Sequence, residues 1–131
     1  MTPRFLLDTH VVVRWVIEPR KLAREQRRVV EAAAARQETV AISAVSLLEI
    51  AALEKSRRID VEIRDIFAIL QAQPVFQILP ITFEIAFETS YLHTLRDPVD
   101  RAIVATALVH RLRLVTSDQR IVESKLVPVV E

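Results

Sequence analysis

The sequence predicts an α/β protein, specifically a three-layer α/β/α sandwich with a central parallel sheet. Short apolar runs alternate along the 131 residues with longer stretches whose apolar residues recur at helical spacing. The chain also contains no Gly and no Asn, which two-residue hairpin turns use at positive φ. Strands joined through helices need no such turns, so parallel strands covered on both faces by helices are favoured.

The N-terminal half is predicted to begin with a short buried strand, RFLL, and to continue with two helices, the strand ETVAIS and two further helices. Pro19 suits the first turn of the second helix because its ring fixes φ near the helical value. The later helices carry apolar residues three and four positions apart. The predicted bounds are 4–7, 9–17, 19–36, 38–43, 44–57 and 61–71.

The C-terminal half is predicted to contain a third strand (QILPI), two helices, a fourth strand (LRLVTS) and a fifth (VPVV). The predicted bounds are 77–81, 83–95, 98–112, 112–117 and 127–130. No repeat, linker or low-complexity tract interrupts the pattern, and the length suits one hydrophobic core. Residues 1–131 are therefore expected to form one domain.

The composition predicts a folded protein of the cytoplasm. Apolar residues make up 51% of the chain and charged residues 27%, the balance of a soluble domain. No apolar run reaches the roughly 18 residues that a membrane span needs, and Arg4 and Asp8 interrupt the only N-terminal segment resembling a signal peptide. The chain has no Cys, which agrees with a reducing compartment. Without Gly it also has no phosphate-binding P-loop and no dinucleotide fingerprint.

Five carboxylates stand where a predicted strand ends or a predicted helix begins: Asp8, Glu49, Asp97, Asp100 and Asp118. In an open α/β sheet, ligands bind outside the carboxyl ends of the strands, so these acids are expected to converge on one crevice. Carboxylate oxygens suit Mg²⁺ and Mn²⁺. The sequence therefore predicts a site for a divalent cation.

Each acid also has a purely structural interpretation. Asp8, Asp97 and Asp118 are suited to be helix N-caps, and Asp100 would then stabilise a helix dipole. Glu49 stands three residues after Ser46, the spacing of a capping box. Capping alone does not explain why Asp8 follows an apolar run or why Glu49 interrupts an apolar helix face.

The cationic residues are mostly Arg, which can bind a phosphate through two parallel hydrogen bonds. Only three of the eighteen cationic residues are Lys. Arg96 and Arg101 flank the third acid, where they could meet substrate phosphates or pair with nearby carboxylates. This charge pattern permits a nucleic-acid substrate without selecting one.

Four segments together resemble the PIN domain, specifically the VapC-type ribonuclease toxins of toxin–antitoxin pairs: FLLDTHVVVRW, SAVSLLEIA, DPVDRAIVATALVHRL and LVTSDQRI. By motif, Asp8 matches the first acid of the family, Glu49 the second, Asp100 the third and Asp118 the fourth. Asp97 matches an extra acid of one subgroup. The chain departs from the pattern at 56–59, where SRRI replaces a frequent Gly-Arg-Leu.

This resemblance implies a PIN-like α/β/α fold, dependence on Mg²⁺ or Mn²⁺, endonucleolytic cleavage of RNA, a homodimer and inhibition by a cognate antitoxin. In the expected roles, Asp8 and Asp100 ligate the main ion, while Glu49 and Asp118 hold a water molecule or a second ion. The number of metal ions stays open.

Other functions remain as alternatives. A phosphoryl-accepting receiver domain would need an acidic pair after the first strand, and an aspartyl phosphatase would need Asp where this chain has His10. Within the nuclease interpretation, a PIN-like nuclease acting on DNA or in RNA processing stays open. A non-catalytic RNA- or protein-binding relative is the remaining alternative, although retention of all four acids argues against it.

Two apolar features are expected to serve packing or partner binding. The aromatic residues Phe83, Phe87 and Tyr91 fall at helical spacing, and with Trp15 they are expected in the core or in a subunit interface. The apolar residues of 47–53 and 63–70 form either hidden core or a surface for a partner's amphipathic helix.

Overall fold

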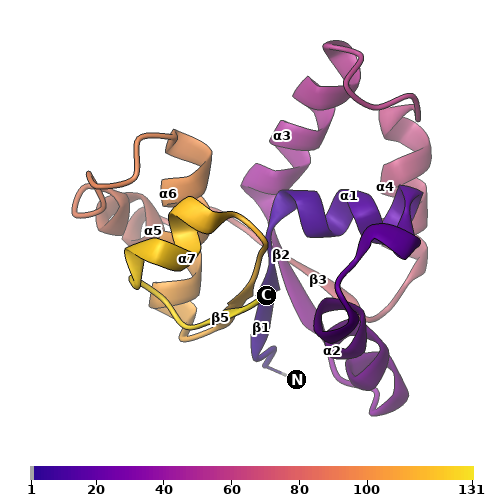
Figure 1. The fold of residues 1–131 in the computed structure, drawn as a ribbon, viewed down its shortest axis with the longest axis horizontal. Helices are drawn as coiled ribbons and strands as arrows, with labels where there is room; N and C mark the ends of the chain where they lie inside the picture. The colour runs from indigo at the N-terminus through magenta and orange to yellow at the C-terminus, as the bar shows by residue number, and fades with distance from the viewer. Residues whose placement is uncertain (1) are drawn as a thin grey trace.

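Five parallel strands form the centre of the computed structural model, which describes residues 2–131 (Figure 1). Their order in the sheet is β3-β2-β1-β4-β5. The strands are β1 (Phe5–Leu7), β2 (Val40–Ser43), β3 (Phe76–Leu79), β4 (Arg113–Val115) and β5 (Val129–Val130). In the middle of the sheet, Leu6 of β1 pairs with Ala41 of β2 on one side and with Leu114 of β4 on the other. The predicted central parallel sheet is confirmed.

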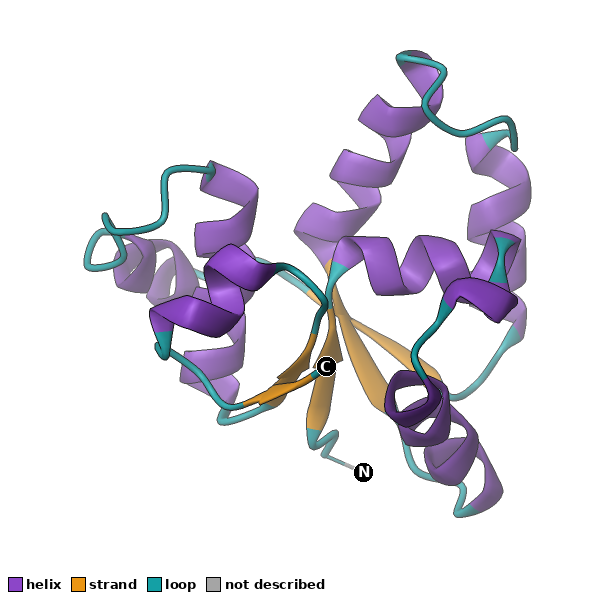
Figure 2. Cartoon of the chain, in the orientation of Figure 1, coloured by secondary structure: helices purple, strands orange, loops and turns teal. Residues whose placement is uncertain are grey.

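Helices cover both faces of this sheet, which gives the predicted three layers (Figure 2). They are α1 (Thr9–Ile17), a 3₁₀ turn (Pro19–Lys21), α2 (Arg24–Ala35), α3 (Ala44–Lys55), α4 (Ile63–Ala72), α5 (Phe83–Thr89), α6 (Pro98–His110) and α7 (Gln119–Ser124). Helices α5, α6 and α7 lie on one side of the sheet, and α1, α2 and α4 on the other (Figure 1). None of the helices in residues 2–131 combines the length and apolar character that crossing a bilayer requires.

Alternation along the strands builds two cores, because successive side chains point to opposite faces of a sheet. Leu6 belongs to the core beneath α5, α6 and α7, and Leu7 to the core beneath α1, α2 and α4. The first core includes Ala41, Ile85, Ile103, Leu114 and Ile121. The second includes Val11, Val30, Ile42, Ile66 and Val115. Burial on both faces explains why the inner strands β1 and β2 read as nearly continuous apolar runs.

The strand order places a topological switch point at β1. From β1 the chain adds β2 and β3 on one side, and it later returns to add β4 and β5 on the other. Connections leaving the carboxyl ends of β1 and β4 therefore run in opposite directions and leave a crevice between them. Asp8 directly follows β1, and Thr116 directly follows β4.

Two predicted helices differ from the structure, and one observed helix, α7, had no predicted counterpart. The helix expected over 19–36 is divided, because Ala23 adopts an extended backbone and its N–H donates to the Gln26 side chain, which starts α2 at Arg24. The helix expected over 83–95 ends at Thr89, where the hydroxyls of Thr89 and Ser90 bond to carbonyls of the preceding turn.

Four helix ends use a left-handed residue that is not glycine. Gln37, Arg57, Arg111 and Lys125 have φ between 56° and 62° and follow α2, α3, α6 and α7. Glycine usually fills this position, and the chain has none. Arg57 lies in the segment where SRRI replaces the family's frequent Gly-Arg-Leu, so this departure changes the residue at a turn and leaves the turn in place.

Candidate active site

Asp8 is a carboxylate buried at the end of the central strand. It is 5% exposed and follows Leu7 of β1. Its Oδ1 accepts a hydrogen bond from the backbone N of Thr9 at 2.7 Å, which makes Asp8 the N-cap of α1. Its Oδ2 accepts a hydrogen bond from the Thr116 hydroxyl at 2.6 Å. Both oxygens are held, so the carboxylate has a fixed orientation.

Thr116 connects Asp8 to Asp118. Its buried hydroxyl donates to Asp8 and accepts a hydrogen bond from the backbone N of Asp118 at 3.0 Å. Asp118 in turn caps α7, since its Oδ1 accepts from the backbone N of Arg120 at 2.9 Å. One hydroxyl thereby fixes the relation between acids that lie 110 positions apart in the sequence.

Helix α6 contributes two further acids. Asp97 is its N-cap and accepts a hydrogen bond from the backbone N of Val99 at 2.8 Å. Asp100 lies in the first turn, with a side chain that is 14% exposed. The charges of Asp97, Asp118 and Asp8 all act on Asp100. The structure therefore places four aspartates from three separate segments near one another, and we call them the acid cluster: Asp8, Asp97, Asp100 and Asp118.

Glu49, the remaining expected acid, is half-buried on α3 and is not among the residues that line the pocket beside Asp8 and Asp118. Ser46, three residues earlier and thus on the same side of the helix, is buried and accepts a hydrogen bond from the Thr9 hydroxyl at 2.8 Å. Helix α3 begins at Ala44 with Ser43 as its N-cap, so the alternative of a Ser46–Glu49 capping box is wrong. Within residues 2–131 the Glu49 side chain forms no hydrogen bond or ion pair.

Burial and mutual repulsion act on the acid cluster. Burial raises the pKa of Asp8 against the effect of its hydrogen bonds. Burial, together with the charges of Asp97, Asp118 and Asp8, raises the pKa of Asp100 to about 6 from its ordinary value of 3.8. For Asp118, burial also acts upward, but the hydrogen bonds and charge of Arg120 outweigh it and lower the pKa. A divalent cation would relieve this repulsion because it favours the ionised carboxylates.

Arg120 is the cation paired with the acid cluster. Its Nη2 lies 3.1 Å from Oδ2 of Asp118 and 3.8 Å from Oδ2 of Asp100. Its Nε donates to Oδ1 of Asp118 at 3.3 Å. The side chain is 74% exposed, and ion pairs in contact with solvent stabilise a protein only weakly. The guanidinium therefore neutralises charge without being locked in place.

A pocket of about 300 Å³ opens beside the acid cluster. It is lined by Asp8, Asp118, Arg120, His10, Arg14, Val11 and Ser117. Among residues 2–131, no three Asp, Glu, His or Cys side chains converge closely enough to hold a metal ion as they stand. Arg120 between Asp100 and Asp118 offers a physical reason. The donor set consists of carboxylate oxygens, which fit a hard divalent cation.

Two residues of this region were missed by the sequence analysis, Arg120 and Gln26. Gln26 is fully buried, and its Nε2 donates to the Ser117 hydroxyl at 2.8 Å, which ties α2 to the loop before α7. Its neighbours in REQRR are charged, so the sequence pattern places it on a solvated face. For Arg120 the only signal was its position two residues after Asp118.

The two arginines expected beside the third acid differ in their surroundings. The Nε of Arg101 donates to the backbone carbonyl of Leu95, so this side chain is engaged within the loop before α6. Arg96 is exposed, and it lies in the loop that leads to α6. Neither forms an ion pair with an acid in residues 2–131.

Comparisons with known proteins agree with this architecture. The family model described as "PIN domain" matches residues 5–125. The chain is similar to Ribonuclease VapC22 of Mycobacterium tuberculosis, with 34% identity over 118 residues that cover 88% of each protein.

Solved structures similar to this one support the fold. VapBC2 from Rickettsia felis, bound to a DNA fragment from its promoter, has a TM-score of 0.75 at 16% identity, covering 96% of each chain. FitAcB from Neisseria gonorrhoeae has a TM-score of 0.66 at 24% identity, covering 97% of this chain and 96% of that chain.

We expect Thr116→Val to destabilise the protein by about 1 to 3 kcal/mol, because it leaves a buried carboxylate one hydrogen bond short. Urea unfolding in EDTA measures this. Thr106→Val is the matched control, since the buried Thr106 hydroxyl bonds only to the Ala102 carbonyl of its own helix. Equal losses in the two variants would contradict the role given to Thr116.

The raised pKa of Asp100 predicts a pH-dependent effect of Asp100→Asn in EDTA. Below about pH 4 the carboxyl is protonated in both the folded and the unfolded protein, so the variant is no more stable than wild type. As pH rises from about 4 to about 6, the unfolded wild type releases a proton that the folded wild type retains, so wild-type stability falls relative to the variant.

Above about pH 6 the free energy of unfolding of Asp100→Asn should exceed that of wild type by the largest amount. The full pKa difference sets a limit of roughly 3 kcal/mol, which screening in this open pocket reduces to about 1 kcal/mol. Urea unfolding across this pH range measures it, with Asp60→Asn in the exposed α3–α4 connection as the control. A gain that is independent of pH, or a loss above pH 6, would contradict this prediction.

Proposed function

The chain belongs to the PIN-domain family, and from that premise we propose that it is a metal-dependent endoribonuclease, the toxin of a toxin–antitoxin pair. The observation that carries the proposal is the acid cluster at the switch point of a chain 34% identical to a ribonuclease over most of its length. The acid cluster supports metal-dependent hydrolysis, and the similarity to a ribonuclease supports RNA as the substrate class. The reaction is hydrolysis of an RNA phosphodiester bond.

Asp8, Asp100, Asp118 and Glu49 are proposed to hold Mg²⁺ or Mn²⁺, with Asp97 as a further acid beside them. When bound, a divalent cation of this kind neutralises charge on a phosphodiester and lowers the pKa of a water molecule. The hydrogen bonds to both oxygens of Asp8 support its role as the fixed ligand. For Glu49 we propose the role of a metal ligand that can adjust its position, because no protein group in residues 2–131 bonds to its carboxylate.

The pocket beside the acids is suited to an RNA backbone. Arg14 and His10 line it together with Asp8, and the Arg14 side chain forms no ion pair within residues 2–131. A guanidinium in this position is able to bind a phosphate oxygen and to orient the scissile bond toward the acids. Because DNA offers the same phosphates, it is the competing substrate in the experiment below.

The proposed antitoxin site is an apolar pocket of about 310 Å³ between α3, α4 and β3. Leu47, Phe67, Leu70, Phe76 and Ile78 line much of it. An amphipathic segment of a partner could cover these side chains.

Since RNA and a reducing environment both belong to the cytoplasm, we place the protein and its antitoxin there.

We expect the purified protein to cleave single-stranded or looped RNA in Mn²⁺ or Mg²⁺ and to lose this activity in EDTA. Asp8→Asn and Asp100→Asn should each lower cleavage by at least about a hundredfold, because the charge that holds the cation is reduced. Cleavage of labelled RNA and DNA of the same sequence measures both points.

Asp60→Asn, outside the pocket, serves as the control variant in this assay. Wild-type activity in the Asp8 and Asp100 variants would reject the metal-nuclease proposal. Cleavage of DNA alone would keep the mechanism and reject the RNA substrate. Absence of cleavage together with RNA binding would favour the non-catalytic relative.

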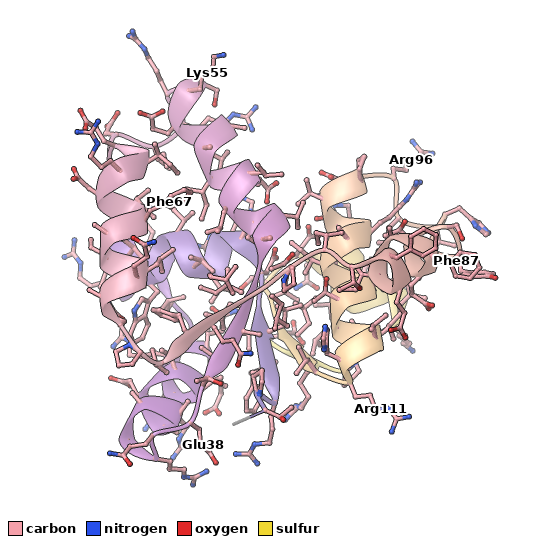
Figure 3. All side chains as sticks on the ribbon, turned by 180° about the vertical axis from the view of Figure 1, so that it is seen from behind. Glu38, Lys55, Phe67, Phe87, Arg96 and Arg111 are labelled. Atoms are coloured by element: carbon pink, nitrogen blue, oxygen red, sulfur yellow. The ribbon has the colours of Figure 1, made fainter. Side chains whose placement is uncertain are left out.

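A homodimer through α5 is also proposed. Phe83, Phe87 and Tyr91 are 90%, 58% and 62% exposed, so they are not core residues, and the rings of Phe87 and Tyr91 contact each other edge to face. Trp15, by contrast, is partly buried against Phe76. Phe67 beside the proposed antitoxin pocket and Phe87 on α5 lie on opposite sides of the molecule (Figure 3), so both surfaces can be used at once.

We expect Phe83→Glu together with Phe87→Glu to convert a dimer into a monomer, because two charges would enter an apolar contact. Sedimentation equilibrium measures the mass. Leu48→Glu, which places a charge on a residue that is 72% exposed on α3, is the control and should leave the mass unchanged. A wild-type monomer, or a dimer that survives the double substitution, would contradict the α5 interface.

A further inference from the structure

We infer that Arg120 is a built-in, exchangeable counter-ion of the acid cluster: its guanidinium holds Asp100 and Asp118 and must leave before a divalent cation can reach them. The inference rests on the proposed function, because it concerns the same acids. It assigns to Arg120 a specific role, which is to set the concentration of metal that the enzyme needs.

The ion pairs of Arg120 join two acids from different helices. Asp118 caps α7, and Asp100 lies in the first turn of α6, yet both carboxylates lie within 3.8 Å of the same nitrogen, Nη2. Toward Asp118 the contact is two-pronged, because Nε and Nη2 reach Oδ1 and Oδ2 at 3.3 and 3.1 Å. The guanidinium therefore occupies the space between two proposed metal ligands.

Departure of the guanidinium requires little rearrangement. The side chain is 74% exposed, so rotation into solvent breaks no buried packing. The hydrogen bond from the backbone N of Arg120 to Asp118 does not depend on the side chain, so the cap of α7 remains when the guanidinium moves. The exchange is thus a change of side-chain rotamer on a fixed backbone.

Charge makes the exchange a competition. Arg120 brings one positive charge to carboxylates that repel one another, whereas a divalent cation brings two. Every metal ion that binds must first displace the guanidinium, so Arg120 weakens the apparent metal affinity. Arg14 provides the matched comparison: it lines the same pocket, but its side chain makes no ion pair in residues 2–131.

The test is titration of metal-free protein with Mn²⁺, followed by calorimetry, for wild type, Arg120→Gln, Arg120→Lys and Arg14→Gln. We expect Arg120→Gln to bind Mn²⁺ about tenfold more tightly, because the competing ion pairs are lost. Arg120→Lys keeps the charge without the two-pronged contact and should fall between this variant and wild type. Arg14→Gln removes the same charge without an ion pair and should gain less than about threefold.

Thermal melting supplies a second readout. In EDTA, Arg120→Gln should melt below wild type because repulsion in the cluster is no longer balanced, and saturating Mn²⁺ should raise its melting temperature by more than it raises that of wild type. Because this side chain is exposed, all four proteins are expected to fold.

Unchanged or weaker Mn²⁺ binding by Arg120→Gln would overturn the inference. An equal gain in Mn²⁺ affinity in Arg14→Gln would also overturn it, because the effect would then depend on net charge alone. If wild type binds Mn²⁺ and cleaves RNA while its affinity is indifferent to Arg120, only the inference fails. If neither wild type nor Arg120→Gln binds Mn²⁺, the proposed function fails with it.

Discussion

The arrangement of this molecule depends on keeping a carboxylate buried at the end of its central strand. A buried carboxylate is costly unless hydrogen bonds replace its water. Asp8 obtains one bond from the first amide of α1 and another from Thr116, which follows the neighbouring strand β4. The pairing of β1 with β4 and the start of α1 at Thr9 are thus conditions for the site as well as features of the fold.

The elements predictable from the sequence are those whose burial leaves a local pattern. All five strands were predicted within a few residues. Burial on both faces produces the short apolar runs of the inner strands β1 and β2. The proximity of Asp8 and Asp118 could be predicted because each directly follows a predicted strand, and the carboxyl ends of parallel strands meet at one edge of the sheet. The division of the second helix could not, because it depends on Gln26 turning inward to bond Ser117, a partner 91 positions away.

The pairing of Arg120 with Asp100 could not be predicted from the sequence for a related reason. Adjacency of α6 and α7 is set by the core beneath them, which includes Ile103 and Ile121. Only after that packing is formed does a residue on the first turn of α7 reach an acid on the first turn of α6. Spacing along the chain gives no indication of a contact between residues 20 positions apart on two different helices.

The capping and metal-site interpretations of the aspartates turn out to be compatible. Asp8, Asp97 and Asp118 do cap α1, α6 and α7, so three helices begin at the acid cluster. The amides of a first helical turn carry partial positive charge, and each such terminus stabilises a nearby carboxylate by roughly 0.3 to 1 kcal/mol. Capping therefore offsets part of the repulsion among these acids. Burial first, and the charges of Asp97, Asp118 and Asp8 after it, still raise the pKa of Asp100, so part of the repulsion remains for a cation to neutralise.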